Sequence, residues 1–165
     1  MPFTPFHLGA GAAFKAAGGR HFSFMVFGGT QVLMDLEPGY KLLTGGAPLH
    51  GPSHTLAGAL LIGLLAAVIG KPVSELAFRL AGRADLRIGW GSAFAGALLG
   101  AFSHILLDAV MHADMHPWRP FGDGNGLLGW LPVNDLHLYC AGLGLIGGLL
   151  VWLRYSKVAA KERNG

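Results

Sequence analysis

IGWGSAFAGALLGAFSHILLDAVMHADMHP, residues 88–117, joins an uncharged apolar run to a cluster of ionisable side chains. The apolar part, from Ile88 to about Met111, is long enough for a membrane-spanning helix, which needs about 20 mostly apolar residues. The second part holds His104, Asp108, His112, Asp114 and His116. We therefore interpret this stretch as a membrane helix that ends in a polar site.

The composition of the whole chain also favours a membrane protein. Of its 165 residues, 52% are hydrophobic and 13% are charged, whereas soluble domains carry about 25% charged residues. The formal net charge of +3 is too small and too scattered to indicate nucleic-acid binding, so the lipid bilayer is the expected partner. With one cysteine, Cys140, the chain forms no internal disulfide.

Further apolar segments flank the decisive stretch on both sides. They are Phe22–Met34, which is short and contains Gln31, then Thr55–Gly70 and Leu136–Leu153; a short helix is expected before them at Thr4–Ala17. Glycines four apart, as at Gly96 and Gly100, allow membrane helices to approach closely. We expect an all-α integral membrane helical bundle, a single domain over residues 1–165, with about four transmembrane helices plus the short N-terminal helix.

If the chain crosses the membrane back and forth, the basic residues and the histidines fall on opposite sides. Ten of the 12 Lys and Arg residues then fall on one side, and only Lys41 and Arg119 on the other. The positive-inside rule makes the basic side cytoplasmic. Seven of the eight histidines fall on the other side; only His21 lies at the basic end. A polar site is therefore expected at the non-cytoplasmic face.

The spacing at this face is typical of metal ligands. His104, Asp108 and His112 are four residues apart and share one face of a helix. Ionisable groups inside a membrane are costly and need partners, and zinc binds His nitrogen and carboxylate oxygen. We predict a divalent metal site, with zinc as the expected ion. Its candidate ligands are His7, Asp35, His50, His54, His104, Asp108 and His112.

Other polar residues have simpler interpretations. An H-x-x-x-D pair alone can be an internal hydrogen bond, and Asp35–Pro38 can be a helix end before a proline. His21 and His137 are expected to be structural, and His116 is either a ligand or a loop residue. Glu37 and Asp114 are the candidate general bases.

The motifs occur in an order that resembles the predicted membrane-bound, metal-dependent hydrolases regulated by LexA in bacteria. The matching elements are TPFH with His7, MDLEP with Asp35 and Glu37, HGPSHT with His50 and His54, and SHILLD with His104 and Asp108. That family is grouped with zinc-dependent phospholipase C and single-strand nucleases, which are all-helical and hold zinc with His and Asp. The family often has H-R where this chain has His50-Gly51; Arg119 is a candidate replacement.

The resemblance implies a zinc-dependent hydrolase of the bacterial inner membrane. A bound metal lowers the pKa of water toward about 7, which suits attack on a phosphoester. A site at the bilayer edge suggests a phosphoester or lipid-like substrate. Two alternatives stay open: a non-catalytic membrane metal-binding or transport protein, and a scaffold whose polar groups only pack the helices.

Overall fold

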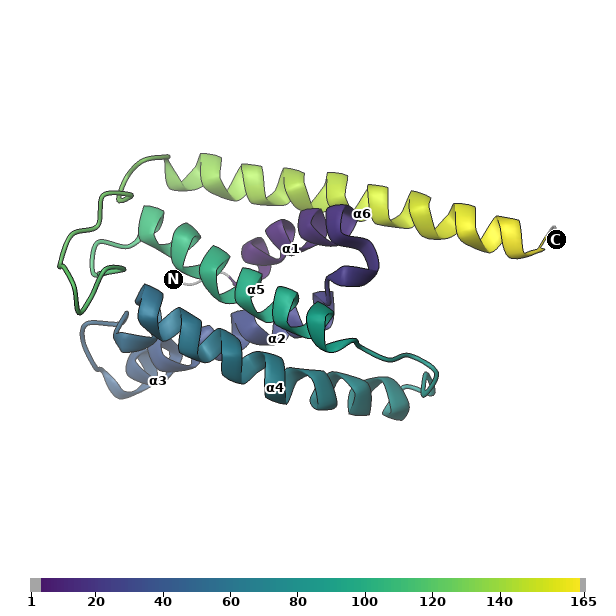
Figure 1. Ribbon diagram of the computed structural model, residues 1–165. Coiled ribbons are helices and arrows are strands. Elements are labelled where there is room, and N and C mark those ends of the chain that lie inside the picture. The colour runs from purple at the N-terminus through teal and green to yellow at the C-terminus, as the bar shows by residue number, and fades with distance from the viewer. Residues whose placement is uncertain (1–3, 164–165) are drawn as a thin grey trace.

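The computed structural model describes residues 4–163, which form a bundle of helices without any strand (Figure 1). The α-helices are α1 (Thr4–Gly18), α2 (Phe24–Met34), α3 (Leu36–Thr44), α4 (Leu56–Leu80), α5 (Trp90–Met111) and α6 (Val133–Arg163). Two short 3-10 helices, at Gly19–His21 and Pro52–His54, precede α2 and α4. The expected all-α class is therefore confirmed.

Three helices are long and apolar enough to cross a membrane: α4, α5 and the part of α6 at Val133–Lys157. The expected count of about four spans is not confirmed. The first apolar segment forms α2, whose 11 residues cover only about 16 Å of a hydrocarbon core about 30 Å thick. Of the three candidate spans, α5 is the most buried, so it forms the centre of the bundle.

The two N-terminal helices run in opposite directions inside the bundle (Figure 1). α1 packs chiefly on α6, whereas α2 packs on α5 and α4. The start of α1 and the end of α2 meet beside α5, because His7 and Asp35 both lie close to His104. The chain thus returns to the same end of the bundle without a full fourth span.

Close backbone contacts hold these helices in place. A Cβ atom at Gly96 of α5 would lie 2.4 Å from the carbonyl oxygen of Ser23, and one at Gly9 of α1 would lie 1.9 Å from that of Cys140 in α6. Only glycine permits such approaches. The Ser23 side chain also caps α2 by accepting a hydrogen bond from the Val26 backbone N–H.

One unexpected helix, α3, follows α2 almost without a break. Pro38 does not end a helix here; it lies in the first turn of α3, where its missing N–H costs little. Leu36, Tyr40 and Leu43 of α3 are exposed. An exposed apolar face on a short helix at the end of the bundle is typical of a helix that lies at a membrane surface.

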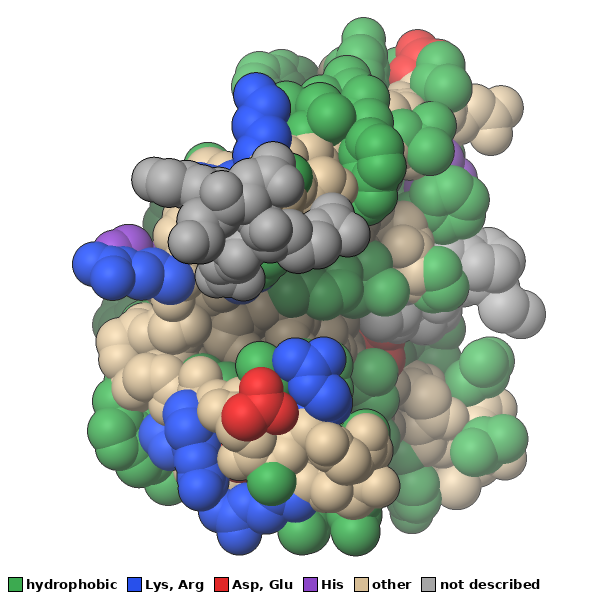
Figure 2. Space-filling view, turned by 90° about the vertical axis from the view of Figure 1, so that its right-hand side faces the viewer, with side chains coloured by type: hydrophobic (Ala, Val, Ile, Leu, Met, Phe, Trp, Pro, Cys, Tyr) green, Lys and Arg blue, Asp and Glu red, His purple; other side chains and the backbone are tan. Residues whose placement is uncertain are grey.

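The surface agrees with insertion in a bilayer. Exposed leucine and isoleucine side chains cover the outer faces of α4 and α6: Leu60, Leu61, Leu64, Leu65, Ile69, Leu145, Ile146, Leu149 and Leu150. Figure 2 shows Lys and Arg side chains gathered at one end of the molecule, near the α4–α5 connection. Large exposed apolar faces mark membrane contact in a protein of this composition.

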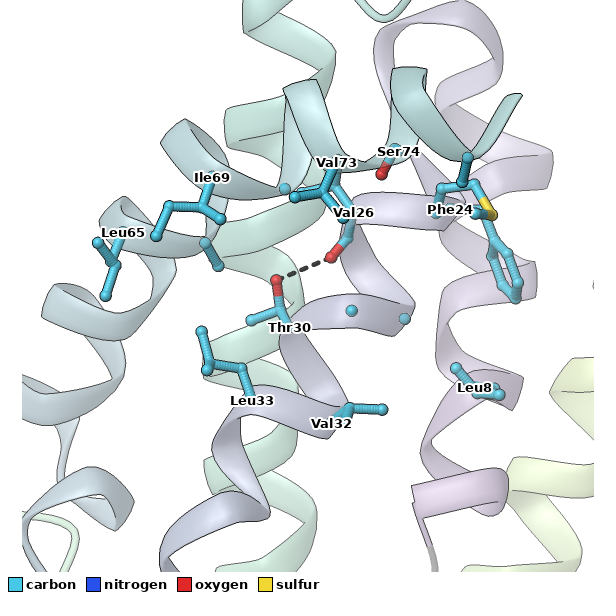
Figure 3. A pocket seen from close by; sticks show the side chains of 16 residues that line it. Leu8, Phe24, Val26, Thr30, Val32, Leu33, Leu65, Ile69, Val73 and Ser74 are labelled. Carbon is cyan, nitrogen blue, oxygen red and sulfur yellow. Dashed lines mark hydrogen bonds between the residues drawn. The ribbon is translucent and has the colours of Figure 1, made fainter. Parts of the chain in front are cut away.

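An apolar cavity of about 550 Å³ lies between α1, α2 and α4 (Figure 3). Its lining includes Leu8, Leu33, Leu65 and Ile69, and Thr30 contributes a hydroxyl. That hydroxyl donates to the backbone oxygen of Val26, 2.8 Å away, so it is already hydrogen-bonded within α2. None of the predicted ligands is part of the cavity lining.

Candidate metal centre

Asp108 lies at the centre of a cluster of five histidines. Its side chain is completely buried in the last turns of α5, one helical turn after His104. The Nε2 atoms of the histidines lie close to its carboxylate oxygens: His104 at 3.1 Å, His7 at 3.4 Å, His54 at 3.5 Å, His50 at 3.9 Å and His112 at 4.0 Å. One carboxylate thus faces ring nitrogens from three separate parts of the chain.

The secondary structure explains how these residues meet. His104 and Asp108 share one face of α5, and His112 follows at its end, where the backbone becomes extended. Asp35 occupies the junction between α2 and α3, and its Oδ1 lies 3.3 Å from His104 Nε2. His54 ends the 3-10 helix before α4. All seven predicted ligands therefore gather at one end of the spanning helices.

Several buried polar atoms in this cluster lack hydrogen bonds. They are the Nε2 atoms of His7, His50 and His112 and both carboxylate oxygens of Asp108. Burying such groups without a partner costs free energy, and native proteins rarely tolerate it. Because all of these atoms point to one place, a bound cation accounts for them together.

The ligand atoms form two groups that share Asp108. The first contains Asp35, His54, His104 and Asp108, and the second contains His50, Asp108 and His112; within each group the ligand atoms lie within 4.8 Å of one another. Imidazole nitrogen with carboxylate oxygen suits zinc and other divalent transition metals. His7 belongs to neither group, but it lies beside Asp108. The buried His and Asp residues can therefore hold a metal ion.

Gln31, which is not among the predicted site residues, orients His104 from the side away from Asp108. Its Nδ1 lies 2.7 Å from Oε1 of Gln31, and the Gln31 amide donates to the backbone oxygen of Gly100 at 3.0 Å. The Gln31 oxygen therefore accepts from Nδ1–H, so Nε2 is the nitrogen that a neutral His104 offers to a metal beside Asp108. In the sequence, the feature that indicates this role is a glutamine within an apolar segment, one helical turn before Asp35.

Asp114 holds His50 in the same manner. Its Oδ1 lies 2.8 Å from His50 Nδ1, and its Oδ2 accepts from the backbone N–H groups of Leu49 and His50 at 3.0 and 3.1 Å. These hydrogen bonds outweigh burial and lower the pKa of the Asp114 carboxyl. Asp114 thus contacts the ring nitrogen of His50 that faces away from Asp108.

Glu37 acts on His54 through Ser53. Its carboxylate accepts hydrogen bonds from the backbone N–H and the hydroxyl of Ser53, whose Oγ lies 2.8 Å from His54 Nδ1. Its other oxygen pairs with Lys41 at 2.8 Å. Burial raises the pKa of Glu37, but the bonds from Lys41 and Ser53 lower it more. Both expected general bases therefore contact the outer side of the cluster.

Burial also keeps two of the histidines neutral. It lowers the pKa of His54, and it lowers the pKa of His7 to about 4. Neutral imidazole has a lone pair, which metal binding requires. At neutral pH these two side chains are therefore ready to bind a cation.

The remaining histidines lie outside the cluster. His137 stacks on Phe6 with ring centroids 4.3 Å apart, which agrees with its expected structural role. His116 Nδ1 lies 2.8 Å from the backbone oxygen of Asp123, so it belongs to the loop before α6. His21 is exposed beside Arg20, at the opposite end of α1 from His7.

Comparison of the chain with protein-family models, with curated proteins and with solved structures gave no match.

Proposed function

We propose that this chain is a membrane-embedded, metal-dependent hydrolase that acts on a phosphoester or lipid-like substrate. The observation that carries the proposal is the convergence of buried His nitrogens on the Asp108 carboxylate, several of these atoms without a hydrogen bond, at one end of three apolar helices. The motif order that resembles the LexA-regulated membrane hydrolases supports the same reaction class. Zinc is the ion that the His and Asp donors favour.

Two sets of residues in this chain would bind metal. His54, His104 and Asp35 complete one set of donors around Asp108, and His50 and His112 complete the other. A divalent metal, when bound, supplies Lewis acidity and lowers the pKa of water. We assign to Glu37 and Asp114 the orientation of His54 and His50, in place of the general-base role expected from sequence.

The position of the cluster favours an enzyme over a transporter. An apolar core separates the cluster from the basic end of the bundle; it includes Val26, Ala66, Ala67, Ala93 and Ala97. A conduit for ions needs polar or ionisable groups along the membrane interior. The ligands instead gather at one end of the bundle, close to the expected membrane surface. We place this end on the non-cytoplasmic face of a bacterial inner membrane, because most basic residues gather at the other end.

The first test is the metal content of the purified, detergent-solubilised protein. We expect about one or more equivalents of zinc or another transition metal in the wild type, and none in the His104→Ala/Asp108→Ala variant. Asp85→Asn, in an exposed pair at the basic end, serves as the control. Release of phosphate or alcohol from phosphodiester and phospholipid substrates then tests hydrolysis. If the folded wild-type protein binds no metal after loading, the proposal is wrong. If it binds metal but hydrolyses none of the substrates, the non-catalytic alternative is favoured.

A further inference from the structure

A second cavity, of about 540 Å³, lies at the same end of the bundle as the metal centre. Lys41, His50, His116 and Arg119 line its polar side, and no Asp or Glu is part of its lining among residues 4–163. Lys41 and Arg119 are the two basic residues that the chain order separates from the rest. A cavity with cationic walls and no carboxylate in its lining favours an anion.

Lys41 is held firmly at the edge of this cavity. Its Nζ lies 2.8 Å from Glu37 Oε1, and its side chain is only 23% exposed. A Cβ atom at position 51 would lie 2.5 Å from that Nζ and 1.9 Å from Oε1, so a side chain after His50 would displace the Glu37–Lys41 pair. One hydrogen bond to Glu37 leaves further ammonium donors for a ligand.

Arg119 supplies the second cation from the loop after α5. It pairs with Asp123 through Nε. The terminal nitrogens of the guanidinium carry the other N–H donors, in the planar arrangement that suits phosphate oxygens. Half of the Arg119 side chain is exposed, so a ligand can reach it. Two cations from different parts of the chain thus face one space.

The cavity lies between the metal centre and the lipid-facing surface. His50 is part of its lining, and its Nε2 lies 3.9 Å from Asp108 Oδ2. On the other side, Ala57 and Leu61 of α4 form an apolar wall. Leu61 is 68% exposed and continues into the leucine-rich outer face of α4. A ligand that fills this space therefore has an anionic head near the centre and an apolar tail along α4.

We propose that this cavity binds the phosphate group of a phospholipid. Lys41 and Arg119 bind the phosphate oxygens, and Leu61 contacts an acyl chain. The inference deepens the proposed function and rests on it for the reaction, but the binding of the head group requires only the two cations. Lipid binding and metal binding can therefore be measured separately.

Calorimetric titration of the full-length, detergent-solubilised protein with dihexanoylphosphatidate tests this proposal, in EDTA so that no metal attracts the anion. We expect Lys41→Gln and Arg119→Gln each to weaken binding about tenfold, as the loss of a charge-assisted hydrogen bond predicts. Leu61→Ser should weaken the binding of phosphatidate but leave that of inorganic phosphate unchanged.

Matched controls exist at the basic end of the bundle. Lys71→Gln breaks a Lys–Glu pair of the same i, i+4 spacing, and Arg83→Gln breaks an exposed Arg–Asp pair. Both variants should bind phosphatidate like the wild type. Thermal unfolding identifies variants that fail to fold, and Lys41→Arg, which keeps the charge, should retain binding. Because Arg119 is half exposed, its variant tests the proposal even if Lys41→Gln is unstable.

Two results would overturn the proposal. One is unchanged phosphatidate affinity in the Lys41→Gln/Arg119→Gln variant; the other is equal affinity of the wild type for phosphatidate and for inorganic phosphate, which would leave a free-phosphate site without a lipid. Failure of the proposed function gives a different pattern. Phosphatidate then still binds and depends on both cations, while the protein holds no metal or hydrolyses nothing.

Discussion

Gln31 in α2 and His104 in α5 are joined by a contact of 2.7 Å between Oε1 and Nδ1, completely buried within the bundle. The contact turns the other ring nitrogen of His104 toward Asp108, 3.1 Å away. It therefore links the short helix α2 to the geometry of the centre.

Replacement of Gln31 should weaken metal binding without removing any ligand. We expect Gln31→Leu to lower the metal affinity about 10- to 100-fold, because the tautomer and orientation of His104 are no longer fixed. Competition with a chelator of known affinity measures the change. Thr30→Val is the matched control, since Thr30 is buried next to it and bonds only within α2. Equal losses in both variants would point to damaged packing instead.

Loss of His112 should remove one of two ions. His112 belongs to the second ligand group only, whereas Asp108 belongs to both. We expect His112→Ala to reduce bound metal from about two equivalents to about one, because the first group keeps all four of its ligands. Elemental analysis counts the ions, with His116→Ala as the control from the adjacent loop. A single equivalent in the wild type would contradict the two-group arrangement.

Glu37 and Ser53 should act as one unit on His54. Ser53→Ala and Glu37→Gln are each expected to lower metal affinity, and the double variant should be no weaker than Ser53→Ala alone, because both act through one hydrogen-bond chain. Chelator competition measures the metal affinity of the wild type and the three variants, which together form a double-mutant cycle. If Glu37 were instead the general base, Glu37→Gln would keep full metal affinity and lose hydrolysis.

A substitution that disturbs the close packing of α5 on α2 should lower the free energy of unfolding. Gly96→Ala places a Cβ atom 2.4 Å from the Ser23 oxygen, so we expect a loss of about 1–3 kcal/mol, as for other overpacked sites. Thermal unfolding in detergent measures it. Gly91→Ala lies on the same helix with nothing within 4 Å of the new atom, and it should be neutral or slightly stabilising. Equal unfolding temperatures for the two variants would refute the close approach.

The gathering of the ligands could be predicted because it depends on chain order and helix periodicity. His104 and Asp108 share one face of a helix, and alternation of chain direction brings His7, Asp35 and His54 to the same end. His112 lies just past the end of α5, where the backbone is extended, so helix periodicity does not explain its position. The number of spans was harder to predict. Phe22–Met34 is apolar enough for a membrane interior, but only the structure shows that its helix has 11 residues and is packed between other helices.

The direction in which each polar side chain points could not be predicted. Glu37 and Asp114 have the residue type of a general base. The loop conformation determines that they hydrogen-bond to Ser53 and His50. Gln31 was missed for a related reason. Its partner His104 is 73 residues away, so no local pattern connects the two.

The contact between Gly9 and Cys140 has a consequence for how the bilayer could influence the centre. α6 packs chiefly on α1 and hardly on α5, and this contact fixes α1 to α6 only two residues after His7. Asp108, His104 and His54 belong to the other side of the bundle. If a thicker or thinner membrane shifted α6 along its axis, it would carry His7 with it and leave those three in place. Membrane thickness would then act on a single ligand.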